Sequence, residues 1–179
     1  LGMKHDPEGL AQLAKRLDAE VPNAKLVVVS SGDGADWLAQ ERERRGLRSL
    51  RLLPFQPFEA FPDVLGSADV LVAVLEPEAS AVSVPSKVLA YLCAGRPTVL
   101  SVPADNLAAE LVTRADAGVV VSPGDHHALA ASVIGLLGDN RRRQRLGASG
   151  RTYAEAAFDL DHVAERVENV LRKAVEARG

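Results

Sequence analysis

Two hydrophobic periods alternate along the chain and predict two kinds of element. Short runs rich in valine, leucine and alanine are typical of strands buried on both faces of a parallel sheet. These runs occupy residues 25–31, 50–53, 69–75, 98–102 and 118–121. Between them, apolar residues recur every three or four positions, which predicts amphipathic helices. We expect helices from residue 7 onward, from residue 34 to about 46, and over 58–65, 85–94, 106–114, 126–137, 140–146 and 153–176.

The order of these elements predicts one α/β domain over residues 1–179, with a Rossmann-like parallel sheet flanked by helices. Strands separated by helices form βαβ units, in which the strands run parallel. The first helix, with Asp6 as N-cap and Pro7 in its first turn, follows no strand. We therefore expect a strand to precede Leu1, with residues 1–5 as its end and the following loop. The helices after residue 140 are expected to pack outside the sheet.

Composition and charge narrow the class of function. The 179 residues include 21 Lys and Arg and 24 Asp and Glu, so the net charge is −3 and no nucleic-acid partner is expected. The single cysteine, Cys93, excludes an internal disulfide and a four-cysteine zinc site, and we expect it to be buried. His126 and His127 lack a metal-ligand spacing. No apolar run is long enough to span a membrane, so a cytoplasmic protein is expected.

Ligands of open parallel sheets bind beyond the carboxyl ends of the strands, near helix N-termini. The loop that ends in Pro85, Ser86 and Lys87 carries the strongest signal of this kind. A helix start attracts anions through its free N–H groups and its dipole, and here a hydroxyl and a positive charge are added. Lys4 could bring a second charge to the same phosphate. The alternative is that Ser83 caps the helix and that both lysines are merely solvated.

A partial glycine-rich loop, Ser-Gly-Asp-Gly at 31–34, follows the first strand and opens a helix. It makes Gly32 a candidate ligand contact, although a tight turn between strand and helix explains the pattern equally well. Trp37 stands where a dinucleotide-binding fingerprint would have its third glycine. The sequence therefore argues against a standard NAD site.

Three of the four phenylalanines lie close together in a proline-rich loop after the second strand. Phe55 and Gln56 directly follow the strand end, where an aromatic face and free backbone groups could hold a planar base. Phe58 and Phe61 are expected to form a small core beneath the loop. The basic run Arg141–Arg145 is expected to be a solvated helix face, with attraction to an anionic membrane surface as the alternative.

The stretch from Pro85 to Val99, PSKVLAYLCAGRPTV, resembles the PSK-x-x-x-Y-x-x-x-G-x-P segment of bacterial glycosyltransferases of family 4. The opening LGMKHDP, the strand at 69–74 and the long final helix fit this resemblance as well, so that it covers essentially the whole chain. It implies the C-terminal half of a two-domain GT-B fold, which binds a nucleotide-sugar donor. It also implies transfer with retention of anomeric configuration, without a metal ion or a cofactor.

Carried over by position, the resemblance implies one donor-binding set: Gly2, Lys4, Gly32, Phe55, Gln56, Ser86 and Lys87. Within it, the two lysines and the serine would contact the diphosphate, and the phenylalanine and glutamine would hold the base. The donor is expected to be a UDP- or GDP-linked sugar. The acceptor is expected to be a glycan, a lipid or a polysaccharide.

The sequence departs from the family pattern at two positions. Many relatives carry glutamates eight residues apart that contact the ribose and the donor sugar, and these would fall at Val82 and Ala90. Glu76 and Glu78 could replace them from the loop, and no catalytic residue is assigned. Because the N-terminal acceptor domain is absent, we expect half of an enzyme, inactive alone. Peripheral association of the full enzyme with the inner face of the cell membrane is a further expectation.

Two other functions stay open at this point. An enzyme resembling a nucleotide-sugar epimerase would also bind a UDP-sugar, but it would need acid and base side chains within this chain. A non-catalytic α/β binding module, such as a receiver-like domain, would bind no nucleotide. A receiver needs clustered acids after its first strand and a lysine after its fifth, whereas Lys87 follows the strand at 69–75.

Overall fold

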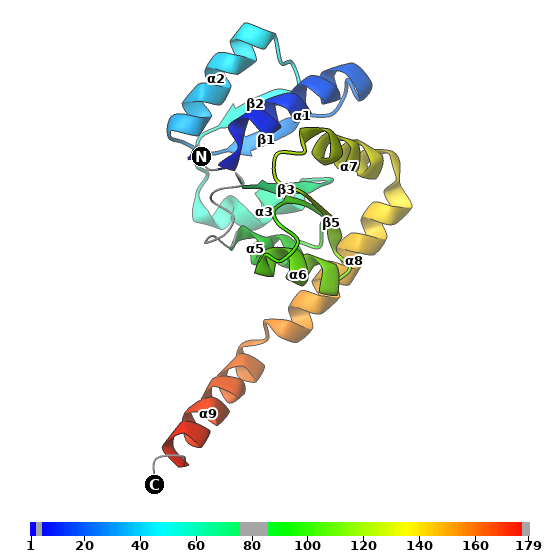
Figure 1. Ribbon diagram of the computed structural model, residues 1–179. Coiled ribbons are helices and arrows are strands. Elements are labelled where there is room, and N and C mark those ends of the chain that lie inside the picture. The colour runs from blue at the N-terminus through cyan, green and yellow to red at the C-terminus, as the bar shows by residue number, and fades with distance from the viewer. Residues whose placement is uncertain (3–4, 76–85, 177–179) are drawn as a thin grey trace.

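The computed structural model describes residues 1–2, 5–75 and 86–176, apart from the side chain of residue 162. Helices and strands follow the predicted alternation (Figure 1). The described elements are α1 (Pro7–Glu20), β1 (Leu26–Val29), α2 (Asp33–Arg45), β2 (Leu50–Leu53), η2 (Phe58–Ala60), α3 (Phe61–Gly66), β3 (Leu71–Val74), α5 (Lys87–Cys93), β4 (Thr98–Ser101), α6 (Leu107–Arg114), β5 (Gly118–Val121), α7 (His126–Gly138), α8 (Asn140–Ala157) and α9 (Leu160–Glu176). The α/β class is therefore confirmed.

All described strand pairs are parallel, but the strands form two sheets. β1 pairs with β2, with Leu26 opposite Leu50, and β4 lies between β3 and β5. Gly118 opens β5 opposite Thr98, and a Cβ at this glycine would lie 1.9 Å from the Thr98 carbonyl oxygen. Only glycine therefore allows this approach of the two strands. The parallel pairing that the sequence predicts is confirmed, and the division into two sheets was not predicted.

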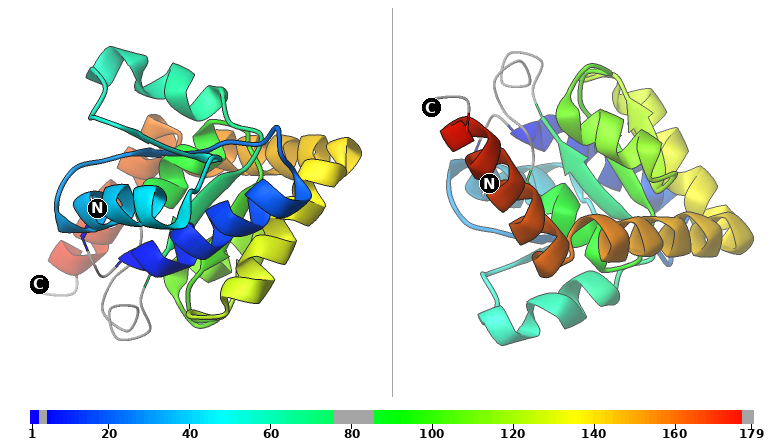
Figure 2. Two further views of the ribbon diagram at one scale, coloured as in Figure 1. Left: turned by 90° about the horizontal axis from the view of Figure 1, so that it is seen from above. Right: turned by 90° about the horizontal axis from the view of Figure 1, so that it is seen from below.

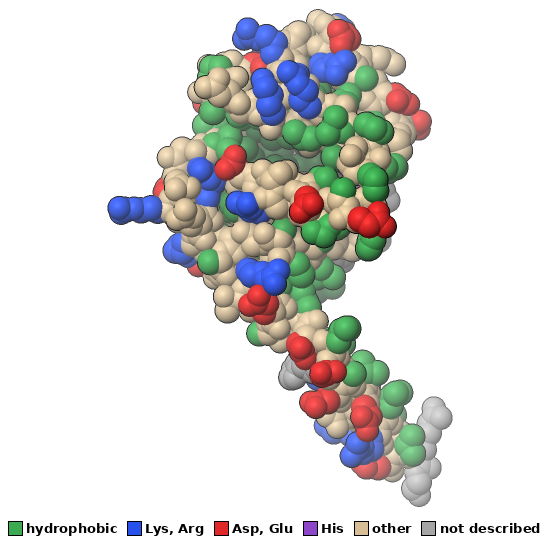
Figure 3. All heavy atoms as spheres, turned by 180° about the vertical axis from the view of Figure 1, so that it is seen from behind, with side chains coloured by type: hydrophobic (Ala, Val, Ile, Leu, Met, Phe, Trp, Pro, Cys, Tyr) green, Lys and Arg blue, Asp and Glu red, His purple; other side chains and the backbone are tan. Residues whose placement is uncertain are grey.

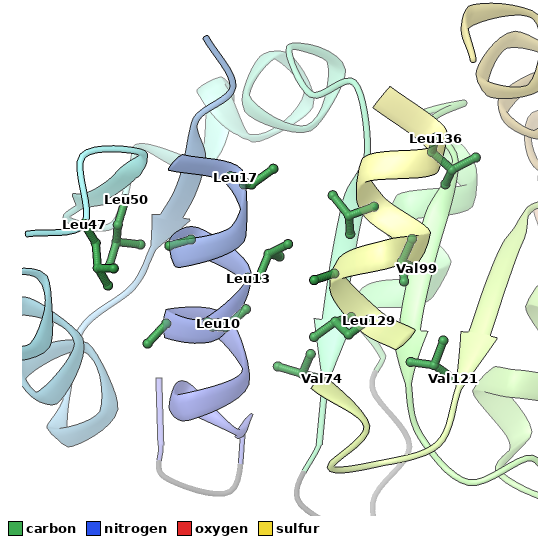
Figure 4. Packing of buried hydrophobic residues seen from close by; sticks show 14 of the residues in the cluster. Leu10, Leu13, Leu17, Leu47, Leu50, Val74, Val99, Val121, Leu129 and Leu136 are labelled. Atoms are coloured by element: carbon green, nitrogen blue, oxygen red, sulfur yellow. The ribbon is translucent and has the colours of Figure 1, made fainter. Parts of the chain in front are cut away.

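Alternate residues of β3, β4 and β5 belong to two different apolar clusters. Val74, Val99 and Val121 pack with the buried leucines of α1 and α7 (Figure 4). Ala73 and Leu100, which point the opposite way, pack with the buried residues of α5 and α6. A period of two along each strand is what a sheet covered on both faces requires, and Figure 2 shows helices on both sides of the strands.

Side-chain caps explain where several helices begin. The Asp6 carboxylate accepts a hydrogen bond from the Gly9 N–H at 2.8 Å, and Pro7 occupies the first turn of α1. Asn106 caps α6 through the Ala108 N–H at 3.0 Å. These caps satisfy N–H groups that have no partner inside the helix. The predicted end of α2 is confirmed as well, because Gly46 takes the left-handed conformation with φ 64°.

The predicted break between residues 146 and 153 is wrong, because α8 runs without interruption to Ala157. Gly147 and Gly150, which suggest a break in the sequence, are instead points of close packing. A Cβ on Gly147 would lie 2.3 Å from the carbonyl oxygen of Gly95, and one on Gly150 would lie 2.9 Å from Cβ of Ala117. The glycines therefore let α8 approach the rest of the domain.

Two further expectations about the C-terminal part are corrected. Cys93 is exposed, because the C-terminal end of α5 turns its last residue outward. α8 packs on α5, but α9 extends away from the other elements (Figure 1). The apolar residues of α9 are accordingly exposed: Leu160, Val163, Val167, Val170, Leu171 and Val175. Within the described residues, no helix is both long and apolar enough to cross a membrane.

Candidate functional site

The carboxyl ends of the two sheets meet around the first residues of the chain. The Leu1 carbonyl accepts a hydrogen bond from the Gly34 N–H at 2.9 Å, just after β1. The Asp6 carboxylate lies 3.0 Å from Nε2 of His126, just after β5. The sheet of β1 and β2 lies on one side of this point, and the sheet of β3, β4 and β5 lies on the other side. Open α/β sheets bind ligands at such a switch point.

Gly2 lies at this edge, and its carbonyl accepts a hydrogen bond from the His5 N–H at 3.1 Å. The turn after β1 comes very close to it. A Cβ on Gly34 would lie 2.7 Å from the Leu1 carbonyl oxygen and 3.2 Å from that of Gly2. Gly34, which the sequence identified only as part of a turn, is therefore required for this approach. Lys4, the predicted second charge, lies outside the described residues.

Gly32 forms the predicted tight turn between β1 and α2. Its φ of 94° favours glycine, and its carbonyl accepts hydrogen bonds from the Ala35 and Asp36 N–H groups at 2.8 and 3.1 Å. Asp33 and Asp36 stand in the first turn of α2. Because these carboxylates already complement the positive end of the helix dipole, the turn is less suited to a phosphate than the start of α5.

Ser86 and Lys87 stand at the start of α5, where no acidic side chain occupies the first turn. Both residues are exposed, and the side chain of Ser86 makes no capping hydrogen bond to the helix. Within the described part of the chain, no carboxylate pairs with Lys87. Although Lys87 is exposed, desolvation by the surrounding protein lowers the pKa of its ammonium group. The edge thus presents a cation and a hydroxyl to solvent.

Packing fixes the position of α5 beneath these two residues. Val88 and Leu92 are buried, and the Tyr91 hydroxyl donates a hydrogen bond to the Val72 carbonyl in β3 at 3.2 Å. Desolvation raises the pKa of Tyr91 to about 12, so the hydroxyl stays protonated and keeps donating at physiological pH. The tyrosine of the PSK-x-x-x-Y segment therefore anchors the helix to β3.

The loop after β2 exposes its aromatic rings. Phe55 is 70% exposed, and the Gln56 amide donates to the Pro54 carbonyl at 2.8 Å. The expected local core of Phe58 and Phe61 is wrong, since these side chains are 86% and 45% exposed. Phe58 opens η2 and Phe61 opens α3, and neither short helix buries its aromatic ring. No described hydrogen bond joins this loop to the start of α5.

Two cavities lie beside α5, and they differ in chemistry. One of about 380 Å³ lies between α5 and α6 and includes Ser86 and Leu107 in its lining. The other, of about 390 Å³, lies at the opposite edge, before β3 and β4, and is lined by arginines. Those arginines already donate to backbone carbonyls, such as Arg151 to Cys93 at 2.6 Å. The two cavities are of similar volume, but the arginines of the second already bond to carbonyl groups at helix ends.

One pair of side chains near the edge, His126 and Asp6, was not predicted from the sequence. His126 opens α7, as expected, but its contact with the buried Asp6 carboxylate joins positions that are far apart in the sequence. No local pattern could have indicated this pair. In the ranges that the structure describes, no group of three or more His, Cys, Asp or Glu side chains could hold a metal ion.

Comparison with solved structures shows the same fold in several proteins. HepE from Anabaena, solved with UDP-glucose, gives a TM-score of 0.78 at 19% identity over 97% of this chain and 46% of its own. TarM from S. aureus, solved with UDP, gives 0.78 at 13% identity over 93% and 32%. The chain therefore spans half or less of the length of these two proteins.

A third structure has nearly the length of this chain. The C-terminal domain of the glycosyl transferase group 1 family protein LpcC from Francisella tularensis gives a TM-score of 0.72 at 14% identity, over 89% of this chain and 83% of its own. No curated protein is significantly similar in sequence. Residues 3–139, well over half of the chain, match the family described as Glycosyl transferases group 1. The chain therefore belongs to the glycosyl transferases group 1 family.

Proposed function

We propose that this chain is the C-terminal, donor-binding half of a retaining GT-B glycosyltransferase of the family 4 type. Several findings support the proposal. The chain spans half or less of HepE and TarM, whose structures hold UDP-glucose or UDP, and it matches most of an isolated C-terminal domain. The acceptor would then be bound by a second domain, and the reaction would take place between the two.

The observation that carries the proposal is the free cation at the carboxyl edge. Lys87 stands at the start of α5 without a described carboxylate partner, beside the exposed hydroxyl of Ser86. A nucleoside diphosphate would supply the missing negative charge. During transfer the diphosphate leaves the sugar with additional charge, which a fixed ammonium group stabilises. Phe55 and Gln56 would hold the base, and Gly2, Lys4 and Gly32 would line the same edge.

The two positions where many relatives carry a glutamate also affect how this chain would bind the donor. Ala90 lies on α5, and Val82 lies outside the described residues. Because alanine offers no hydrogen bond to a ribose hydroxyl, we propose that affinity depends more on the diphosphate than on the ribose. An epimerase function is less favoured, since the described edge offers no acid and base pair other than Asp6 and His126, which contact each other.

Calorimetry with UDP, GDP and UDP-glucose tests the proposal on this chain. We expect binding of at least one of them, and a loss of about 10- to 100-fold in affinity for Lys87→Gln. A charge-assisted hydrogen bond contributes about 1.5–3 kcal/mol, and each 1.4 kcal/mol is about tenfold. Lys25→Gln is the matched control, because Lys25 precedes β1 at the opposite edge and donates to the Arg48 carbonyl.

Three outcomes would contradict the proposal. Binding of none of the three ligands by the folded chain would favour a non-catalytic binding module. If both lysine variants bound as tightly as the unmodified chain, Lys87 would not belong to the binding site. Equal losses in both variants would also count against it, since they would show a general charge effect and not a specific contact.

A further inference from the structure

The outer surface of α5 and α6 carries leucines at positions where solvent-facing helix residues are normally polar. Figure 1 shows the two helices on the same side of the strands, and their buried residues, such as Val88 and Ala108, pack in one apolar cluster. Leu89 of α5 is 45% exposed and Leu107 of α6 is 63% exposed, so both side chains lie outside this cluster. Packing of the domain core therefore does not explain these two leucines.

Both leucines line the cavity of about 380 Å³ between α5 and α6, which forms a groove. On α6 the lining includes Leu107, Leu111 and Arg114, which are three or four residues apart and so share one face of the helix. With a rise of about 1.5 Å per residue, the groove follows α6 for about 10 Å. The leucines are therefore not scattered over the surface. They are walls of one elongated groove, and grouped apolar surface of this kind marks an interaction site.

The two ends of the groove differ in charge. At the end near the carboxyl edge of the strands, Lys87 stands in the chain between Ser86 and Val88, which both line the groove. None of the described carboxylates pairs with this lysine. Toward the other end, Arg114 lies 3.9 Å from Glu110 of its own helix, so the two charges offset each other. The groove thus has a cationic end, an apolar middle and a neutral far end.

We propose that this groove binds the single apolar chain of an amphiphile whose anionic head lies at Lys87. The chain and the two exposed leucines leave water together, which is the main favourable term in such binding. Small-molecule sites are mostly apolar, with a few polar groups that fix the orientation of the ligand. Here these groups are the Lys87 ammonium and the Ser86 hydroxyl. The ligand is one molecule and not a bilayer surface, because only a single chain enters between the two helices.

Calorimetry on the whole 179-residue chain tests this with butyl phosphate and octyl phosphate, both below the concentrations at which they form micelles. We expect octyl phosphate to bind at least about tenfold more tightly, because each methylene removed from water favours binding about two- to fourfold. Octyl glucoside carries the same chain on a neutral head. It should bind at least about tenfold more weakly than octyl phosphate, since it lacks the charge-assisted contact with Lys87.

Substitutions of exposed leucines place the chain of the ligand. Leu107→Ser should lower the affinity for octyl phosphate by about 5- to 10-fold, because it removes apolar wall from the groove. Leu89→Ser, on the facing helix, should act in the same direction. Leu171→Ser is the matched control, since Leu171 is 62% exposed and lies on α9. Figure 3 shows apolar side chains along α9, which projects from the rest of the molecule, so this variant should bind octyl phosphate unchanged.

Equal affinities for butyl and octyl phosphate would overturn the proposal, as would unchanged affinity in both Leu107→Ser and Leu89→Ser. Binding to vesicles of phosphatidylglycerol without binding of octyl phosphate would overturn it too, because a basic surface would then attract a bilayer. Dimers in sedimentation velocity that Leu171→Ser disperses, without binding of octyl phosphate, would give the groove to α9 of a second copy. The test uses no nucleotide and the proposal does not rest on the proposed function, so failure of donor binding is a separate outcome.

Discussion

At the residue scale, one arginine joins the first two helices. Arg45 of α2 donates to both carboxylate oxygens of Glu8 of α1, at 2.8 and 2.7 Å, and also to Glu41. Its guanidinium lies 5.7 Å from the centroid of the Trp37 ring. The hydrogen bonds from Arg45 lower the pKa of Glu8 below its ordinary value of 4.5. The planar fork of arginine suits this bidentate contact, which lysine could not replace.

Replacing Glu8 by glutamine should therefore lower stability in a pH-dependent way. A carboxyl whose pKa is lower in the folded state stabilises above its unfolded value and loses this effect as the pH falls through the folded value. Because the pair is partly exposed and screened by solvent, we expect a loss of only about 0.5–1 kcal/mol at pH 7. Urea unfolding from pH 7 to 3 checks this, and the difference from the unmodified chain should shrink below pH 4.5.

Glu20→Gln is the control for this prediction, since Glu20 pairs with Arg16 on the exposed surface of a single helix. Its effect should be smaller than that of Glu8→Gln, because no second element is joined by it. A Glu8→Gln difference that stays constant down to pH 3 would contradict the electrostatic explanation.

At the scale of the element, glycines in helices have two opposite roles here. Gly147 in α8 faces the backbone of Gly95, whereas Gly135 in α7 has no atom within 4 Å of where a Cβ would stand. The first glycine is needed for helix packing. The second is only a weak helix former, about 1 kcal/mol worse than alanine.

The same substitution should therefore have opposite signs at the two positions. Gly147→Ala should destabilise the chain by about 1–3 kcal/mol, because the added Cβ would overlap a backbone oxygen that cannot turn away. Gly135→Ala should stabilise it by about 0.5–1 kcal/mol. Thermal and urea unfolding measure both. If both variants were stabilised alike, the close contact between α8 and Gly95 would be wrong.

The difference between local patterns and contacts that form only on folding explains how far the sequence predicts the fold and the site. The strands and most helix bounds were predictable, because a period of two or of 3.6 is local information. The roles of Gly147 and Gly34 were not, since they depend on segments that meet only after folding. The exposure of Phe58 and Phe61 was missed for the same reason. The place of Ser86 and Lys87 at a helix start was predictable, because a helix start is a local feature, whereas the contact of Asp6 with His126 is not.

At the scale of the whole molecule, the last helix, α9, projects from the domain and does not pack against its core. The edge-to-face contact of Tyr153 and Phe158, with centroids 6.2 Å apart, closes the packed part of the chain. Beyond it, α9 carries an exposed apolar stripe that includes Val167 and Leu171, at 55% and 62% exposure. Such a stripe on a projecting helix contributes little to the stability of the domain, because it removes little apolar surface from water.

A chain that ends at Phe158 should therefore keep the stability of the full chain. We expect the midpoint of thermal unfolding to change by no more than about 2 °C, since a loss of about 1 kcal/mol shifts a domain of this size by roughly 2–4 °C. Scanning calorimetry at equal molar concentrations measures this midpoint. A chain that ends at Thr152 is the comparison, because it also loses Tyr153 and the buried Ala154 and should melt clearly earlier. A drop of more than about 5 °C on removing α9 alone would show that its apolar stripe packs on the domain.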